Sequence, residues 1–189
     1  GGVGGSGRAG QFEAAGPGGG VVRGAMGSGR AVGFADSWLS GLSGETLAAG
    51  AGEVGMRRTR QCARSGEVVL GSVRSGTVEL ADEFRFDRVE LGGTIHLSER
   101  AMLLSDGTPS GTIVLAAETV TLESGGSVVL NNLGEDPSGA LRALLADALT
   151  IDGFPTAGVG RPNYHNTLGS GTAGAIALAA VRPEMSRGP

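Results

Sequence analysis

Lysine is absent from this 189-residue chain, and cysteine, proline and aromatic residues are scarce. All 15 basic residues are arginines, and the formal net charge is −4, which argues against nucleic acid as a main partner because nucleic-acid-binding surfaces are basic. The single cysteine, Cys62, excludes an internal disulfide framework. Aromatic residues make up only 4%, so a core must be built from Val, Ile, Leu and Ala. No apolar run approaches the ~18 residues of a transmembrane helix.

Glycine is abundant, with 37 residues that lack the period of three found in collagen. Glycine combined with alternating aliphatic residues is typical of many short strands joined by tight turns, and it predicts an all-β fold. The chain begins with Gly1-Gly2 and carries neither an initiator methionine nor a signal peptide. We therefore expect that it was processed or belongs to a longer chain or assembly.

A phrase that begins with Ser-Gly and continues with alternating aliphatic residues recurs along the chain. The clearest copy spans Ser110–Leu130, a looser one spans Ser75–Leu97, and a degraded one spans Ser138–Asp152. With a fourth start at Ser170, the intervals are 35, 28 and 32 residues. Alternation puts every second side chain on the same face of a strand. A repeat of this kind predicts a stack of similar coils.

Aligning the copies gives about three short strands per coil and three columns of aliphatic side chains. The first column holds Val78 and Leu80, Ile113 and Leu115, and Ile176 and Leu178; the second holds Val89 and Leu91, Val120 and Leu122, and Leu149 and Ile151; the third holds Ile95 and Leu97, and Val128 and Leu130. The same alignment places Gly92-Gly93 over Gly125-Gly126 as corners. The columns predict a parallel β-helix (β-solenoid) whose ladders fill the interior. Threonines 77, 94 and 112 leave open a shorter, two-strand coil.

The coils are expected over residues 65–189, with long loops at 98–109 and 154–169. Residues 1–64 are expected to form irregular glycine-rich coils or a linker, and the arginine-rich stretch 56–64 an exposed loop. Residues 140–149 have helical spacing as well as the register of the repeat, and the register favours strands.

The phrase SGTIVLAAETVTLESGGSVVLNN and the later GSGTAGAIALAA resemble the Gly-rich right-handed parallel β-helix of bacterial surface proteins, the filamentous-haemagglutinin-like and autotransporter-passenger-like group. The resemblance covers about Ser65–Val181. It implies an extracellular or outer-membrane-associated location, a role as an adhesive or structural scaffold, and glycans or a neighbouring cell surface as partners. It supplies no catalytic residue.

Acidic residues precede each second strand: Asp87, Glu118 and Asp147. In a stack these residues would form a column of like charges, which repel one another unless water or a cation screens them. The column predicts either a corner open to water or a Ca²⁺ site, since calcium prefers carboxylate and carbonyl oxygens. The calcium-binding repeat GGxGxDxUx is absent.

Polar residues gather in the second expected loop: Arg161, Tyr164, His165 and Asn166. These side chains suit sugar binding or acid–base chemistry, although such a cluster in a glycine-rich loop is often incidental. His96 is expected to face solvent opposite the Val129 column. Cys62, among arginines, is expected to be either a reactive thiolate or an unreactive loop thiol.

A polysaccharide-active lyase or hydrolase is the alternative to a scaffold. Asp82, Glu83, Asp87 and Glu90 supply clustered carboxylates, but the next repeat does not complement them into a cleft. A spacer whose binding domains lie elsewhere is a third reading.

Overall fold

A computed structural model describes residues 21–24, 31–41, 43–76, 79–80, 84–85, 89–151, 163–167 and 175–180. The regular secondary structure of these residues consists of strands, with no helix among them. The predicted all-β class is confirmed, and the strands of the two large sheets pair almost entirely in parallel. Within the same residues, no helix is long and apolar enough to cross a bilayer.

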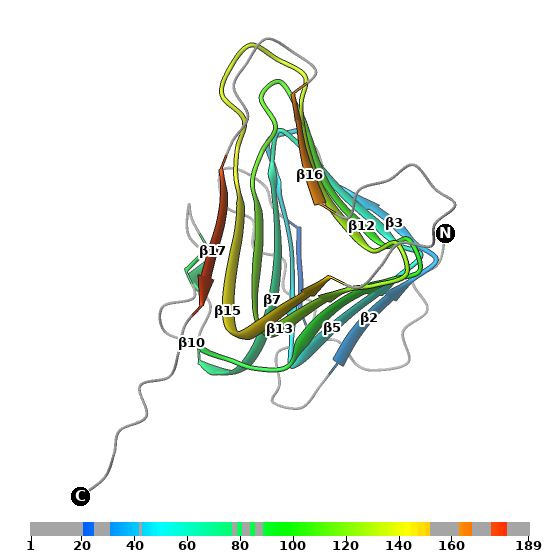
Figure 1. Ribbon diagram of the computed structural model, residues 1–189, viewed down its shortest axis with the longest axis vertical. Helices are drawn as coiled ribbons and strands as arrows, with labels where there is room; N and C mark the ends of the chain where they lie inside the picture. Colours follow the sequence, from blue (N-terminus) through cyan, green and yellow to red (C-terminus); the bar gives the residue numbers. More distant parts are fainter. Residues whose placement is uncertain are drawn as a thin grey trace, which may run out of the picture.

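The strands form three walls around a common interior (Figure 1). Wall 1 contains β1 (Val21–Gly24), β4 (Thr46–Ala51), β7 (Glu67–Gly76), the first halves of β13 (Ile113–Leu122) and β15 (Leu141–Ile151), and β17 (Ile176–Ala180). Wall 2 contains β2 (Ala31–Ala35), β5 (Glu53–Arg57), β11 (Thr94–Ser98) and the second halves of β13 and β15. Wall 3 contains β3 (Trp38–Ser40), β6 (Arg60–Arg64), β12 (Met102–Gly107), β14 (Ser127–Asn132) and β16 (Asn163–Thr167).

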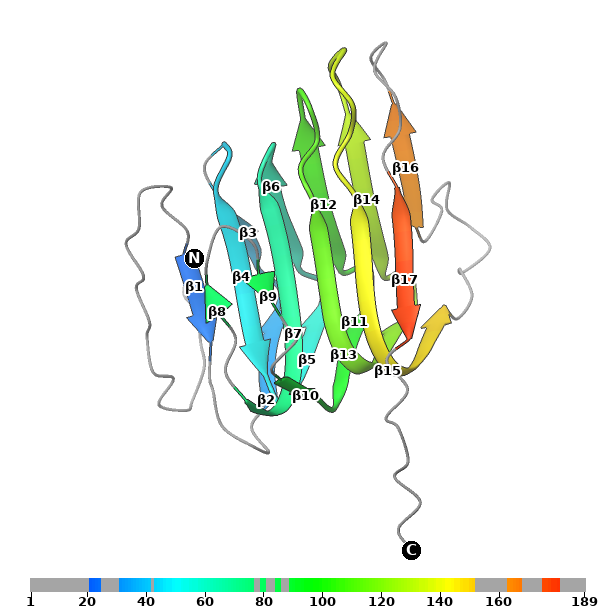
Figure 2. The same ribbon diagram turned by 90° about the vertical axis from the view of Figure 1, so that its left-hand side faces the viewer.

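The chain passes the walls in a fixed order, and we call one passage a circuit. One circuit is β4, β5 and β6, the next is β7, β11 and β12, and the third is β13 and β14. Each strand pairs with the strand that occupies the same wall one circuit earlier or later, so that wall 1 is a row of neighbouring strands (Figure 2).

Aliphatic side chains from alternate strand positions fill the interior. In wall 1, Leu70 of β7 lies beside Leu115 of β13, and both are at most 2% exposed. In wall 2, Ile95 of β11 lies between Val54 and Val120, and all three are at most 1% exposed. Burying each such side chain is worth about 1.5–3 kcal/mol, so these ladders supply the main stabilisation of the fold.

Several predicted columns are confirmed by the strand register. Ile113 and Leu115 align with Ile176 and Leu178 through the intervening strand β15. Val120 and Leu122 align with Leu149 and Ile151. The predicted interval of 28 residues is that from Ile113 to its partner Leu141, and residues 141–151 form a strand rather than a helix.

The predicted copy at Ser75 is wrong, because the chain leaves wall 1 there. Leu80 lies in β8 (Glu79–Leu80), which pairs with β9 (Phe84–Arg85), and β10 (Val89–Leu91) runs antiparallel to β7. Val78 lies outside the described residues. The sequence SGEVVL at Ser65 precedes SGTIVL in the ladder instead, since Val68 pairs with Ile113.

The segment between β7 and β11 packs against the outer face of wall 1. Val69, Val114 and Ala116 face away from the main interior and form a second small cluster. Val89 and Leu91 of the β10 segment pack against this cluster. Val89 and Leu91 therefore bury apolar surface outside the walls, and they are not part of the second column.

The third predicted column is also wrong. Ile95 and Leu97 belong to wall 2, whereas Val128 and Leu130 belong to wall 3 beside Leu103 and Ser105. Gly93 accordingly adjoins Gly52, while Gly126 adjoins Leu97, so the two glycine pairs serve different corners.

The predicted loops at residues 98–109 and 56–64 contain strands. Residues 98–109 include β12, whose Leu103 is fully buried between β6 and β14. Residues 56–64 include the end of β5 and all of β6, where Ala63 is fully buried. Strands β4 to β6 pair with later strands on all three walls, so the two large sheets continue across residue 64.

Candidate functional site

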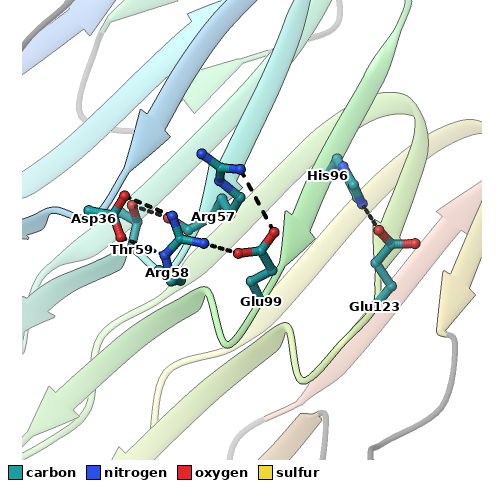
Figure 3. Close-up of polar contacts among 7 residues, drawn as sticks. All are labelled: Asp36, Arg57, Arg58, Thr59, His96, Glu99 and Glu123. Atoms are coloured by element: carbon teal, nitrogen blue, oxygen red, sulfur yellow. Dashed lines mark hydrogen bonds and ion pairs between the residues drawn. The ribbon is translucent and has the colours of Figure 1, made fainter.

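Charged residues line the corner at which the chain passes from wall 2 to wall 3 (Figure 3). Asp36, Arg58 and Glu99 follow β2, β5 and β11, and they have φ angles of 49°, 47° and 50°. Ser124, after β13, has φ 49°. In-register pairing of the preceding strands brings these left-handed residues side by side, one per circuit. The corner therefore carries a row of alternating negative and positive charge.

Ion pairs connect this row. Arg58 donates from Nε to Oδ1 of Asp36 at 2.5 Å and from Nη2 to Oδ2 at 2.9 Å, and its Nη1 donates to Glu99. Arg57 Nη1 lies 3.9 Å from Oε1 of Glu99. The hydrogen bond from Arg58 lowers the pKa of Asp36, and the bond to Asp36 raises the pKa of Arg58. The side chains are about half exposed, so water and salt screen these pairs, and each pair links adjacent circuits but contributes little to stability.

His96 lies on the outer face of wall 2, next to this corner. Its backbone pairs with Gly55 of β5 on one side and Thr121 of β13 on the other, so the expected outward position is confirmed, while the expected position opposite the Val129 column is wrong. His96 Nε2 lies 2.8 Å from Oε1 of Glu123. When the neutral ring donates Nε2–H to this carboxylate, Nδ1 is left as a hydrogen-bond acceptor.

Beside His96, the outer face of wall 2 sinks into an open hollow of about 450 Å³. Gly33 and Gly55 are adjacent in the ladder and form its floor, and a Cβ built on either glycine meets nothing within 4 Å. The lining comes from β2, β5, β11 and β13: Ala31, Val32, Gly33, Glu53, Val54, Gly55, Thr94, His96 and Thr121. The lining is mostly apolar with a few polar groups, as in small-molecule sites, but the hollow is open to solvent on one side and does not enclose a ligand.

The polar cluster predicted near the second loop lies partly on a strand. Tyr164, His165 and Asn166 belong to β16, where their backbones pair with Val129, Leu130 and Asn131 of β14. Arg161 lies outside the described residues. The binding role of this cluster stays a prediction, carried by an edge strand of wall 3 instead of a free loop.

The predicted acidic column is only partly described. Glu118 accepts hydrogen bonds from Arg74 Nη2 at 3.1 Å and from the backbone N–H of Gly93 at 3.3 Å. Asp147 is exposed on β15, and Asp87 lies outside the described residues. Among the residues with described positions, no three His, Cys, Asp or Glu side chains gather as metal ligands. A guanidinium beside Glu118 also opposes a cation there.

Cys62 lies on β6 in wall 3 and is half-buried, so it is not a loop residue. Its Sγ lies 3.6 Å from Oδ1 of Asp106. Burial raises the pKa of the thiol, and Asp106 raises it further, while Arg60 and Arg64 act in the opposite direction. The thiol form is favoured, which disfavours the reactive thiolate.

No protein-family model, curated protein or solved structure matches this chain.

The hollow on wall 2 was missed by sequence reasoning, although a signal for it exists. The segments AVGFA (31–35) and EVGMR (53–57) both place a glycine between two apolar residues at strand spacing. Val32 and Phe34, like Val54 and Met56, pack toward the interior, so the central glycine of each segment must face outward. Two such glycines become a floor only when the strands are neighbours, and this pairing was not predicted.

Proposed function

We propose that the protein is a segment of a right-handed parallel β-helix, or β-solenoid, that acts as an adhesive or structural scaffold in a secreted or cell-surface protein. The observation that carries the proposal is the register of the inward aliphatic side chains on all three walls over successive circuits. Repeating ladders of this kind give a rigid body whose stability depends on contacts between neighbouring circuits. Such a body presents its outer faces and corners to binding partners, and this role requires no catalysis.

Two further features support a scaffold. Most of the described carboxylates with an ion-pair partner join adjacent strands or circuits, as Asp36 and Glu99 do through Arg58. The chain also accommodates excursions at its corners, such as the segment between β7 and β11, while the pairing of β7 with β13 continues. Excursions of this type are the usual place for variable contacts.

The adhesive role is tested with the purified chain on immobilised glycans and on whole cells. Residues 154–161 are replaced by a short Gly-Ser linker, which leaves strand β16 intact, and Asp136→Ser at an exposed corner is the control. We expect saturable binding by the unmodified chain and by the control, with loss in the linker variant if residues 154–161 make the contact. Absence of binding by the unmodified chain would reject adhesion, and a far-UV circular dichroism spectrum dominated by helix would reject the β-solenoid.

A polysaccharide-active enzyme is the second candidate, favoured by the His96–Glu123 pair beside a hollow that also contains Glu53. A histidine and carboxylates at one concave surface can serve as acid and base. Incubation with neutral and acidic polysaccharides, followed by assays for new reducing ends and unsaturated products, tests this activity. Product formation that His96→Ala abolishes would favour the enzyme over the scaffold.

A further inference from the structure

We propose that the hollow on the outer face of wall 2 binds a neutral saccharide. This inference rests on the proposed adhesive function, to which it adds a contact surface and a ligand class. None of the residues predicted as binding or metal sites from the sequence lies in this hollow. Its shape, its hydrogen-bonding groups and the balance of charge around it all favour this ligand class.

The shape of the hollow comes from Gly33 and Gly55, two positions at which packing would also allow a larger residue. Gly33 and Gly55 lie in regular strands, and a Cβ at either position would enter open space. Glycine weakens a strand because it loses more backbone entropy on folding and offers no side chain to pack. In contrast, Gly66 and Gly111 at a corner have a carbonyl group where their Cβ would lie. The glycines of wall 2 therefore contribute free space above the sheet.

The hydrogen-bonding groups around this space favour a ligand rich in hydroxyls. Glu53 contributes a carboxylate, which only accepts, and the His96 ring accepts at Nδ1 when it is neutral and donates Nε2–H to Glu123. Thr94 and Thr121 line the hollow, and their hydroxyls both donate and accept. Acceptors and amphoteric hydroxyls at one surface complement the O–H donors of a sugar ring.

The charge balance favours a neutral ligand. Glu53 and Arg57 flank Gly55 at positions two residues away, so all three share the outer face of β5. Arg57 is engaged by Glu99, and the His96–Glu123 pair adds a second carboxylate near the hollow. An acidic saccharide would be repelled by the carboxylates of Glu53 and Glu123. A free cation would be repelled by Arg57, which lies on the same face of β5. A volume of about 450 Å³ suits a mono- or disaccharide and lies within the usual range of small-molecule sites.

The chain offers a direct readout, because it contains two histidines, His96 in the hollow and His165 on wall 3. Histidine-selective isotope labelling gives one set of ring signals for each. The labelled chain is titrated with glucose, galactose, mannose, N-acetylglucosamine and their disaccharides. We expect at least one of these sugars to shift the His96 signals saturably while the His165 signals stay constant.

A substitution that fills the hollow with a side chain tests whether the ligand binds there. Gly55→Val occupies the floor with a side chain that suits a strand, and Gly41→Val makes the same change after β3, where a Cβ also meets nothing within 4 Å. We expect Gly55→Val to weaken binding by at least about tenfold and Gly41→Val to leave it within about twofold. Thr94→Val, which removes a hydroxyl and keeps the shape, should also weaken binding, and backbone amide spectra verify that each variant is folded.

The outcomes separate this inference from the proposed function. If no sugar shifts His96, or if Gly55→Val binds as well as the unmodified chain, the hollow is not the site. Glycan binding that survives Gly55→Val and is lost on replacing residues 154–161 would overturn the hollow and leave adhesion standing. Absence of glycan and cell binding by the unmodified chain would remove both.

Discussion

Gly111→Ala should destabilise the protein, although Gly→Ala substitutions in compatible strands usually stabilise. Gly111 lies at the corner between walls 3 and 1, next to Gly66 of the preceding circuit and Gly139 of the following one. An added Cβ would overlap the carbonyl oxygen of Gly66 and lie 2.6 Å from its carbonyl carbon. Because backbone atoms of two circuits meet there, no side chain can rotate away to make room.

The magnitude follows from the required movement. Carbon atoms pack at about 3.5–4.0 Å and the carbonyl oxygen of Gly66 is closer still, so the two circuits must separate by at least about 1 Å at this corner. Overpacking of this kind costs about 1–3 kcal/mol. Weakening the adjacent hydrogen bond from Val68 N to Thr112 O, 2.9 Å long, adds about 1 kcal/mol. The lower entropy of the unfolded chain offsets about 0.4–1 kcal/mol. The net loss is about 2 kcal/mol, which lowers Tm by about 4–8 °C for a chain of this size.

Thermal and guanidinium unfolding followed by far-UV circular dichroism measures this loss. The matched control is Gly55→Ala, where the new Cβ meets nothing within 4 Å, and its stability should equal or exceed that of the unmodified chain. Equal stability of Gly111→Ala and Gly55→Ala would refute the close approach of the circuits at this corner.

Other substitutions test the interior, the corner charges and the thiol. Leu115→Ala removes a side chain that is 2% exposed, and it should lower the free energy of unfolding by about 2–5 kcal/mol in chemical denaturation; a loss below about 1 kcal/mol would contradict the buried ladder. Arg58→Gln should raise the pKa of Asp36 toward its usual value, as read from an NMR titration of the carboxyl group. The paired carboxylate has the lower pKa when folded, so its stabilisation is present above the unfolded pKa and is lost as pH falls through the folded pKa; the variant should lack this loss. Alkylation of Cys62 by iodoacetamide, followed by mass spectrometry, should be slower in the folded than in the unfolded chain and faster in Asp106→Asn, and equal rates in all three would contradict the raised pKa.

The parts of the fold that could be predicted are those in which consecutive circuits have similar sequences and no excursion between them. Ser110 and Ser138 begin such a pair, and their hydroxyl oxygens lie 2.5 Å apart. The alternating aliphatic residues after each serine then predict the register of both halves of β13 with β15. The same register correctly favoured a strand over a helix for residues 141–151, because pairing with β13 outweighs the intrinsic helix propensity of Leu and Ala.

The failures have two physical causes. The excursion after β7 contains its own alternating residues, such as Val89 and Leu91, which bury apolar surface on the outer face and so imitate a wall strand. The early strands β4 and β6 lack an aliphatic pattern because alanines, Ala49, Ala51 and Ala63, occupy their buried core positions. The hollow depends on which strands become neighbours, and spacing along the chain does not reveal that.

The excursion after β7 also has a consequence for how the chain folds. Val68 follows its partner Leu47 by 21 residues, and Leu141 follows Ile113 by 28, whereas Ile113 follows Val68 by 45. Closing the longest of these loops costs about 0.4–0.7 kcal/mol more chain entropy than closing either shorter one. Loop closure alone should therefore make the β4–β7 and β13–β15 contacts form about two- to threefold faster than the contact of β7 with β13.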